Sequence, residues 1–339
     1  AAHGCAPYKT VLSHGFVLDG KGNKMSKSLG NTVDPIKLVN QYGADIVRLW
    51  ATSVAYQQDV RISNDIMKQI SENYRKIRNT MRFVLGNLND FKQADLVAVE
   101  ALADVDKYML AQLNDLIKGY HKAYDNYDFA EANQLILNYF TNLSSFYMDF
   151  TKDILYIEKA DSLRRRQVQT VLYYHAKAMM KLISPVLVFT AEELHDHFHC
   201  DDNKADSIFL EPNVEMINMP NSDQLKAHFD RFLELRKDVM KALEGLRNEK
   251  IIKSNMEAKV TISLKDEFKE MASMLADLKQ LFIVAKVELV KDSSLEEFDS
   301  AYIKVEKFEG HQCPRCWNYF DEDEMEGELC PRCHAVING

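Results

Sequence analysis

Apolar positions recur at helical spacing along most of this 339-residue chain. The clearest run lies within 66–91, where the apolar residues are spaced alternately by four and three: Ile70, Tyr74, Ile77, Met81, Val84 and Leu88. This spacing predicts one apolar stripe along a helix. Similar patterns predict further helices over 104–124, 129–150, 164–183 and 224–248. We therefore expect a bundle of amphipathic helices joined by short links.

Strand-like patterns flank this helical region. Residues 10–19 predict a strand, which is followed by a polar loop and then by a helix start with Asp34 as cap and Pro35 as first residue. Near the other end, one helix and three strands alternate over 258–308, which predicts a small α+β unit. The three strands are expected over 258–264, 282–290 and 301–308, and the helix over 265–281.

Composition narrows the class of protein. Hydrophobic residues make up 46% of the chain, which is enough to form buried cores. The formal net charge of −9 excludes a protein that binds polyanions such as nucleic acids over its whole surface. No apolar run is long enough to span a membrane, and the N-terminus lacks the layout of a secretory signal. We therefore expect a cytoplasmic protein, and a start without an initiator methionine indicates a piece of a longer chain.

Residues 24–28 combine two lysines with two serines: Lys24, Met25, Ser26, Lys27 and Ser28. A flexible loop with two ammonium groups can close on a polyphosphate and stabilise the negative charge that builds during displacement. The hydroxyl groups can bind phosphate or pin the loop. A lone pair of lysines at this spacing is usually a solvated loop, so the longer context decides between the two interpretations.

Four cysteines form two Cys-x2-Cys pairs separated by thirteen residues: Cys313, Cys316, Cys330 and Cys333. Each pair can place two thiolates on one metal ion, and the stretch between the pairs can fold back to bring them together. Four thiolates close a tetrahedral site without an open position. The spacing therefore predicts one structural Zn²⁺ rather than disulfide bonds.

The motif at 24–28, followed by LGNTVDP, resembles the second signature of the class I aminoacyl-tRNA synthetases. The longer stretch 7–35 is similar to bacterial-type isoleucyl-tRNA synthetases and, less closely, to the valyl enzymes. Residues 71–91 resemble part of the family's anticodon-binding domain, and the cysteine-rich tail resembles its C-terminal zinc module. The family's HIGH-type signature and its editing domain have no match in these residues.

The resemblance implies a mainly α fold in four parts. Residues 1–55 would end a Rossmann-type catalytic domain, and 56–205 would form the helical anticodon-binding domain. A helix with the small α+β unit would follow over 206–308, and the zinc-binding module would occupy 309–339. The loop-rich stretch around Pro212 supports the boundary before the α+β part.

A basic row on the helix within 66–91 is the expected tRNA contact. Arg75, Arg78 and Arg82 fall to one side of the apolar stripe, where they can follow a phosphate backbone. Asn79 can add a base or ribose contact. A solvated basic face or internal ion pairs are the alternative interpretation, and the resemblance favours tRNA.

The zinc-binding tail is also expected to engage tRNA, but not as a general phosphate clamp. Residues 310–339 contain two arginines against six acidic residues. Arg315, Trp317 and Arg332 are therefore the expected contact points.

The resemblance implies an isoleucine–tRNA ligase as the parent enzyme, with isoleucine, ATP with Mg²⁺ and tRNA(Ile) as substrates. Lys24 and Lys27 would act in catalysis, and residues 24–28 would bind ATP. This chain alone, expected as a monomer, would bind tRNA without catalysis. A fragment of the valyl enzyme, or a stand-alone zinc-containing RNA-binding protein with a vestigial lysine loop, remain the alternatives.

Overall fold

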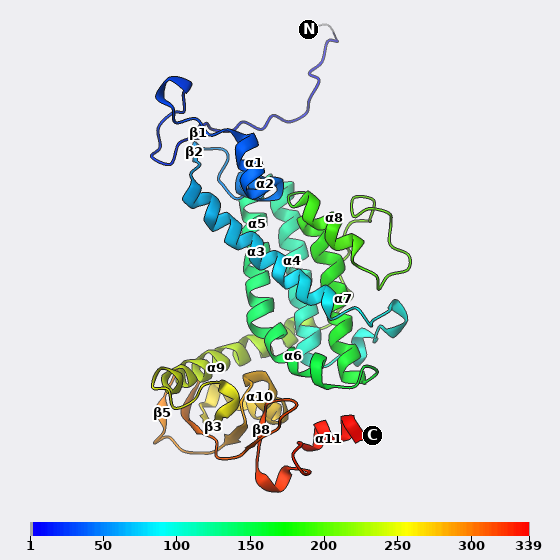
Figure 1. Ribbon diagram of the computed structural model, residues 1–339, viewed down its shortest axis with the longest axis vertical. Helices are drawn as coiled ribbons and strands as arrows, with labels where there is room; N and C mark the ends of the chain where they lie inside the picture. Colours follow the sequence, from blue (N-terminus) through cyan, green and yellow to red (C-terminus); the bar gives the residue numbers. More distant parts are fainter. Residues whose placement is uncertain (1–2, 339) are drawn as a thin grey trace. The chain divides into compact units, whose positions relative to one another are not determined.

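The computed structural model describes residues 3–338 of the chain (Figure 1). The chain folds into two compact units. The first contains Ala1–Asn89, Leu113–Asn142 and Leu172–Met216, and the second contains Asp90–Gln112, Leu143–Val171 and Ile217–Gly339. Within the described residues, no helix combines the length and apolarity that crossing a membrane would need.

The first unit opens with a short β–α segment. β1 (Val17–Leu18) pairs in parallel with β2 (Val60–Arg61), and α1 (Pro35–Tyr42) and α2 (Ala44–Thr52) come between them in sequence. Asp34 caps α1, as predicted, because its side chain accepts a hydrogen bond from the Ile36 N–H. The strand predicted over 10–19 is wrong over most of its length, since the strand itself comprises only Val17–Leu18.

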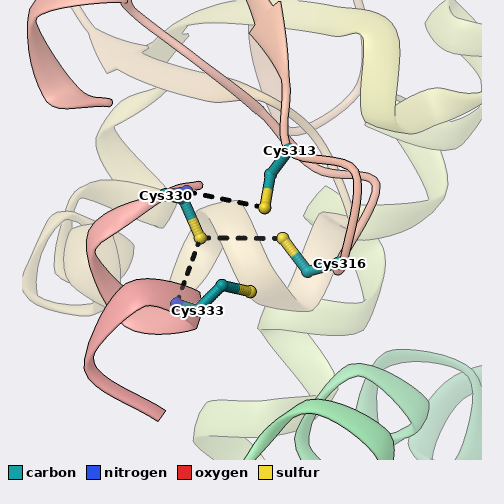
Figure 2. Close-up of side chains that lie close together, drawn as sticks. All are labelled: Cys313, Cys316, Cys330 and Cys333. Atoms are coloured by element: carbon teal, nitrogen blue, oxygen red, sulfur yellow. Dashed lines mark hydrogen bonds between the residues drawn. The ribbon is translucent and has the colours of Figure 1, made fainter. Parts of the chain in front are cut away.

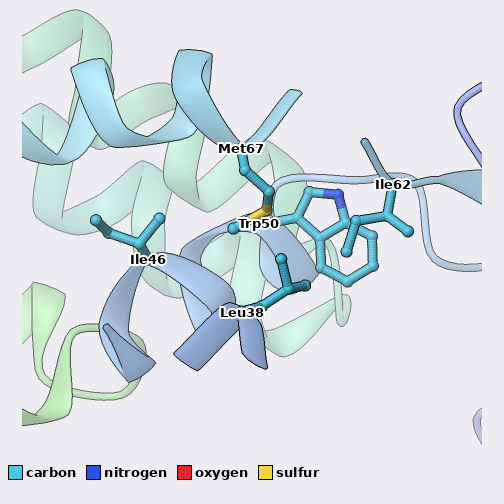
Figure 3. Close-up of a cluster of buried hydrophobic side chains, with 5 residues drawn as sticks. All are labelled: Leu38, Ile46, Trp50, Ile62 and Met67. Carbon is cyan, nitrogen blue, oxygen red and sulfur yellow. The ribbon is translucent and has the colours of Figure 1, made fainter. Parts of the chain in front are cut away.

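A small apolar cluster holds this segment together (Figure 3). It consists of five buried side chains from α1, α2, the residue that follows β2, and α3: Leu38, Ile46, Trp50, Ile62 and Met67. Trp50 also donates from its indole N–H to the Arg61 carbonyl at 3.3 Å. Met25, from the lysine loop, packs against the same cluster. The core of the segment thus reaches the loop that carries the candidate chemistry.

The chain is mostly helical from residue 64 to residue 196. The helices are α3 (Asn64–Gly86), α4 (Asp104–Asp125), α5 (Phe129–Asn142), α6 (Met148–Ile157), α7 (Leu163–Ile183) and α8 (Val188–Asp196). The apolar stripe predicted along α3 is confirmed at Ile77, Met81 and Val84, each 1% exposed. The helix predicted over 129–150 is confirmed in extent, because α5, a π-helical turn over Leu143–Tyr147 and α6 follow one another without a break; the π-helical turn within it was not predicted.

The second unit contains the predicted α+β part. β3 (Ala258–Leu264) lies at its centre, parallel to β4 (Lys286–Leu289) and antiparallel to β6 (Ala301–Lys307), with β5 (Glu296–Glu297) at the edge. The long helix α9 (Ser222–Asn248) packs against β6. α10 (Leu275–Phe282) runs into the predicted strand 282–290, so β4 begins four residues late.

Candidate functional site

Two polar side chains organise the loop that carries the predicted lysines. Asn31 Nδ2 donates to Asp19 Oδ2 at 2.9 Å and to the Lys24 carbonyl at 3.2 Å, while its Oδ1 accepts from the Ser26 N–H at 3.0 Å. The Asp19 carboxylate also accepts from the Asn23 N–H at 2.8 Å. The Asn31 bond first, and then the Asn23 bond, lower the pKa of Asp19 to about 2, so this anchor stays ionised at neutral pH.

The middle of the motif is bound to the fold. Met25 is half-buried against the apolar cluster of Figure 3. Ser26 caps a short 3-10 turn by accepting from the Leu29 N–H at 3.2 Å, and its hydroxyl lies 3.1 Å from that of Ser28. These contacts occupy the serines within the loop itself.

The two lysines of the motif, by contrast, are exposed. The Lys24 ammonium group lies 5.7 Å from the centre of the Phe16 ring, and Lys27 opens the 3-10 turn. Two mobile cations therefore project from a loop whose backbone is held by Asp19 and Asn31. Such an arrangement can place positive charge on a phosphate group without the whole loop having to order.

The predicted basic row lies on α3, where its members have different surroundings. Arg78 forms a two-bond ion pair with Glu193 of α8, with both N–O distances 2.7 Å, and this bond lowers the pKa of Glu193. Arg75 pairs with a glutamate one turn earlier on the same helix, and its side chain is 65% exposed. Asn79 and Arg82 are also exposed. Arg78 thus joins two helices, while the other three residues face solvent.

The four cysteines come together in the zinc module, residues 309–339, as the spacing predicts. Their sulfur atoms all lie within 4.8 Å of one another. Figure 2 shows Cys313 and Cys316 facing Cys330 and Cys333 from the second pair. The N–H groups of Cys330 and Cys333 point to the sulfur atoms of Cys313 and Cys330, both at 3.5 Å. Because such donors stabilise thiolates, the donor set fits one structural Zn²⁺.

The zinc module is fastened to the end of α6. Arg332 makes a two-bond ion pair with Asp153, with 2.7 Å between Nη2 and Oδ1, and Asn318 Nδ2 donates to the same carboxylate at 3.0 Å. Arg315 donates to the carbonyl oxygen of Ile157 at 2.7 Å. The Ile157 side chain itself packs against the cysteines. Arg315 and Arg332 therefore bind the module to the helix, and their contact with tRNA stays a prediction.

Trp317 is the exposed member of the predicted tail contacts. Its side chain is 63% exposed, and it follows Cys316 at the first metal knuckle. Its backbone has a φ of +63°, a conformation that is uncommon for residues other than glycine and that carries strain. A bulky ring is thus presented to solvent by a strained turn next to the cysteine cluster.

Sequence reasoning missed three anchoring residues. Asp19 had a local signal, because an aspartate in a glycine-containing turn commonly accepts hydrogen bonds from backbone N–H groups a few residues later, as it does here from Lys21 and Asn23. Asn31 had none, since it lies twelve positions from Asp19. Asp153 had none, since it lies 179 positions from Arg332 in the chain. Only the folded chain identifies it as the acceptor for the zinc module.

Replacing Asp153 with alanine is expected to loosen the zinc module without releasing its metal. The substitution leaves the Arg332 guanidinium, 30% exposed, with only the more distant Glu158 carboxylate at 3.7 Å, at a cost of about 1–2 kcal/mol. Limited proteolysis should cut near residue 309 at least several times faster, while metal analysis still finds zinc bound.

Asp149→Ala is the matched control for this substitution. Asp149 lies on the same helix and pairs with Lys152 at a half-exposed site, where the ion pair contributes little. Its cleavage rate should equal that of the unaltered chain. Equal protection in the Asp153 variant would show that the ion pair does not hold the module.

Comparison with protein families places three matches along the chain. Residues 1–63 match the class I tRNA synthetases (I, L, M and V), residues 106–262 match the anticodon-binding domain of tRNA ligase, and residues 310–336 match the zinc finger found in FPG and IleRS. The fold and the site thus define part of a class I aminoacyl-tRNA synthetase that carries an anticodon-binding domain and a zinc finger.

The chain is a homologue of the isoleucine–tRNA ligases. It is 49% identical over 331 residues to the isoleucine–tRNA ligase of Geobacillus kaustophilus (strain HTA426). The aligned region covers 95% of this chain and 36% of that protein. The enzyme of Bacillus cytotoxicus is also 49% identical, over 94% of this chain and 35% of its own length. The chain therefore spans about a third of the curated relatives that it matches.

Among solved structures, the agnB2 LeuRS of Agrobacterium radiobacter K84, in its ternary complex with tRNA and LeuAMS, is similar at a TM-score of 0.48. The match has 18% sequence identity and covers 74% of this chain and 25% of that one.

Proposed function

We propose that this chain is the tRNA-binding part of a cytoplasmic, monomeric isoleucine–tRNA ligase. The whole enzyme would activate isoleucine with ATP and transfer it to tRNA(Ile). The observation that carries the proposal is the presence, in one chain 49% identical to isoleucine–tRNA ligases, of a class I synthetase segment, an anticodon-binding domain and a zinc finger in that order. The curated relatives named above favour isoleucine over valine as the amino acid.

In this proposal the lysine loop serves the adenylation step of the whole enzyme. Lys24 and Lys27 stabilise the negative charge that develops on the α-phosphate and on the leaving pyrophosphate of ATP. Met25 and Ser26 hold the loop in place, and Ser28 lies within hydrogen-bond distance of Ser26. The exposure of both ammonium groups supports this role.

In this proposal the tRNA contacts both the basic face of α3 and the zinc module. Arg75, Asn79 and Arg82 contact the backbone or the bases directly, and Arg78 contributes positive charge at the junction of α3 with α8. In the zinc module, Trp317 offers the ring that can stack on a base. Arg315 and Arg332 lie beside it and hold the module on α6.

The test is binding of the chain to tRNA(Ile) and to the same tRNA with its anticodon replaced, each with and without a zinc chelator. Specific recognition predicts affinity for tRNA(Ile) at least tenfold higher, because each lost pair of hydrogen bonds to a base edge costs about 1–3 kcal/mol. Chelation should reduce that affinity further. Equal, weak and strongly salt-dependent binding to both tRNAs would contradict the proposal.

A further inference from the structure

In the first unit, polar side chains fasten α8 to its neighbours α2 and α3. Asp45 of α2 is 6% exposed and accepts hydrogen bonds from the Phe189 N–H at 3.3 Å and from the Thr190 N–H at 2.8 Å. Both donors belong to the first turn of α8, where backbone N–H groups have no partner within the helix. Asp45 therefore fixes the start of α8 against α2.

A chain of hydrogen bonds continues from Asp45 to α3, and the direction of each bond is determined. The Thr190 hydroxyl donates to Asp45 Oδ2 at 2.6 Å, so its only proton is used there. The Tyr74 hydroxyl, 3.0 Å away, therefore donates to Thr190 Oγ1. The Tyr74 oxygen in turn accepts from Arg78 Nη1 at 3.3 Å. The chain thus runs from a cation on α3 to a buried carboxylate on α2.

Glu193, one turn after Thr190 on α8, holds the same guanidinium group. Its two oxygen atoms accept from Nη1 and Nη2 of Arg78, both at 2.7 Å. Together with Tyr74, Glu193 uses both hydrogens of Nη1 and one of Nη2. A bidentate carboxylate and a third acceptor fix the plane of the guanidinium group as well as its position.

One edge of the Arg78 guanidinium group remains unused. Of its five N–H bonds, Nε–H and the second Nη2–H find no acceptor within residues 3–338. These two N–H bonds are parallel, a geometry that matches two oxygen atoms of one phosphate group. The Arg78 side chain is 33% exposed, so a ligand can approach it from solvent.

The surroundings of this edge favour a phosphate backbone as the ligand. Arg75 and Arg82, one turn before and one turn after Arg78 on α3, are both exposed. Cations repeated at each turn of one helix face can follow successive phosphates of a nucleic acid strand. Arginine is also the side chain that binds phosphate through two parallel N–H groups.

We propose that the unused edge of Arg78 binds one backbone phosphate of tRNA, and that Glu193 and Tyr74 are positioning residues that orient the guanidinium group for it. Asp45 and Thr190 act through them, because they fix α8 and the Tyr74 hydroxyl. The proposal rests on the tRNA-binding function proposed above and names one of its contacts. Since a phosphate carries no base information, this contact strengthens the binding of every tRNA equally.

Removing the Glu193 carboxylate distinguishes positioning from a simple effect of charge. Glu193 is an anion on a face that would bind a polyanion, so on charge alone Glu193→Ala would strengthen RNA binding. If Glu193 positions Arg78, the same variant loses the phosphate contact, and RNA binds about fivefold more weakly. The two roles therefore predict changes of opposite sign.

The measurement is the affinity of the chain and its variants for tRNA(Ile) over a series of salt concentrations. Glu193→Ala and Arg78→Ala should each reduce the slope of log affinity against log salt by about 0.7–0.9, the value for one lost phosphate contact. Glu193→Gln keeps one acceptor for Arg78 and should give an intermediate affinity. Tyr74→Phe should bind about threefold more weakly.

Urea denaturation of the same variants excludes a loss of fold as the cause. An ion pair with a purely structural role would shift the unfolding midpoint in Glu193→Ala and leave the salt slope unchanged, and this result would overturn the proposal.

Glu72→Ala is the charge-matched control. Glu72 is 63% exposed and pairs with Arg75, one turn along the same helix. Because no other helix supplies an acceptor to Arg75 in the part of the chain that the structure describes, this variant only removes a negative charge. It should bind tRNA(Ile) with equal or higher affinity and with an unchanged salt slope.

The outcomes separate this contact from the proposed function. If the unaltered chain binds tRNA(Ile) with anticodon dependence but Glu193→Ala binds as tightly as Glu72→Ala, the phosphate contact fails and the proposed function stands. If both tRNAs bind equally and Glu193→Ala weakens both alike, the proposed function fails and the phosphate contact stands. If no tRNA binds, both fail. If Arg78→Ala lowers the affinity for polyglutamate but not for tRNA(Ile), the edge binds an acidic peptide, and the proposal is overturned.

Discussion

Replacing Cys333 with serine is expected to abolish zinc binding and to unfold the zinc module. The module has few other sources of stability, because its core consists of the four cysteines, Ile157 from α6 and three half-buried side chains. Structural zinc in modules of this kind contributes about 10–16 kcal/mol, so the loss of one of four thiolates outweighs every other contact in the module.

Two readouts check this expectation. The zinc content should fall from one equivalent per chain to nearly none, and limited proteolysis should remove the residues after 309 while the helices persist. Cys5→Ser is the control, because Cys5 is an exposed thiol outside the cluster. A variant that keeps a full equivalent of zinc and an intact tail would show that the metal is not held by these four sulfur atoms.

Replacing Asp106 with alanine is expected to destabilise the second unit by about 3–5 kcal/mol, the usual cost of breaking a buried ion pair from one side. The Asp106 carboxylate is fully buried on α4 and binds the Arg164 guanidinium with two hydrogen bonds. It also accepts from the Tyr147 hydroxyl at 2.7 Å. Removing it leaves a largely buried cation and a buried hydroxyl without their acceptor.

The measurement is urea denaturation followed by circular dichroism, with Asp104→Ala as the control. Asp104 lies in the first turn of the same helix and pairs with Lys107, but it is 75% exposed, so its loss should cost less than about 0.5 kcal/mol. The double variant Asp106→Leu/Arg164→Met should recover much of the lost stability, because it removes both charges together. Similar midpoints for the two single variants would contradict the expected cost.

Local features of the fold were predictable because they depend on neighbours in sequence. Three features follow from residues close together in sequence, whose spacing allows only one arrangement. They are the apolar stripe of α3, the Asp34 cap of α1 and the paired cysteines. The strand over 10–19 was not predictable in this way, because a strand exists only as far as a partner supplies hydrogen bonds. The π-helical turn after α5 likewise has no periodic signal.

The features of the candidate site also fall into those that the sequence predicts and those that only the structure shows. The sequence by itself determined which residue types were present: two lysines in a glycine-flanked loop, four cysteines at metal spacing and a row of arginines on one helix. The tertiary structure alone decided that Arg332 meets Asp153, and that Arg78 meets Glu193. The reason is physical: a side chain's partners and its burial depend on chain segments far away in sequence, and only packing brings those segments within hydrogen-bond distance.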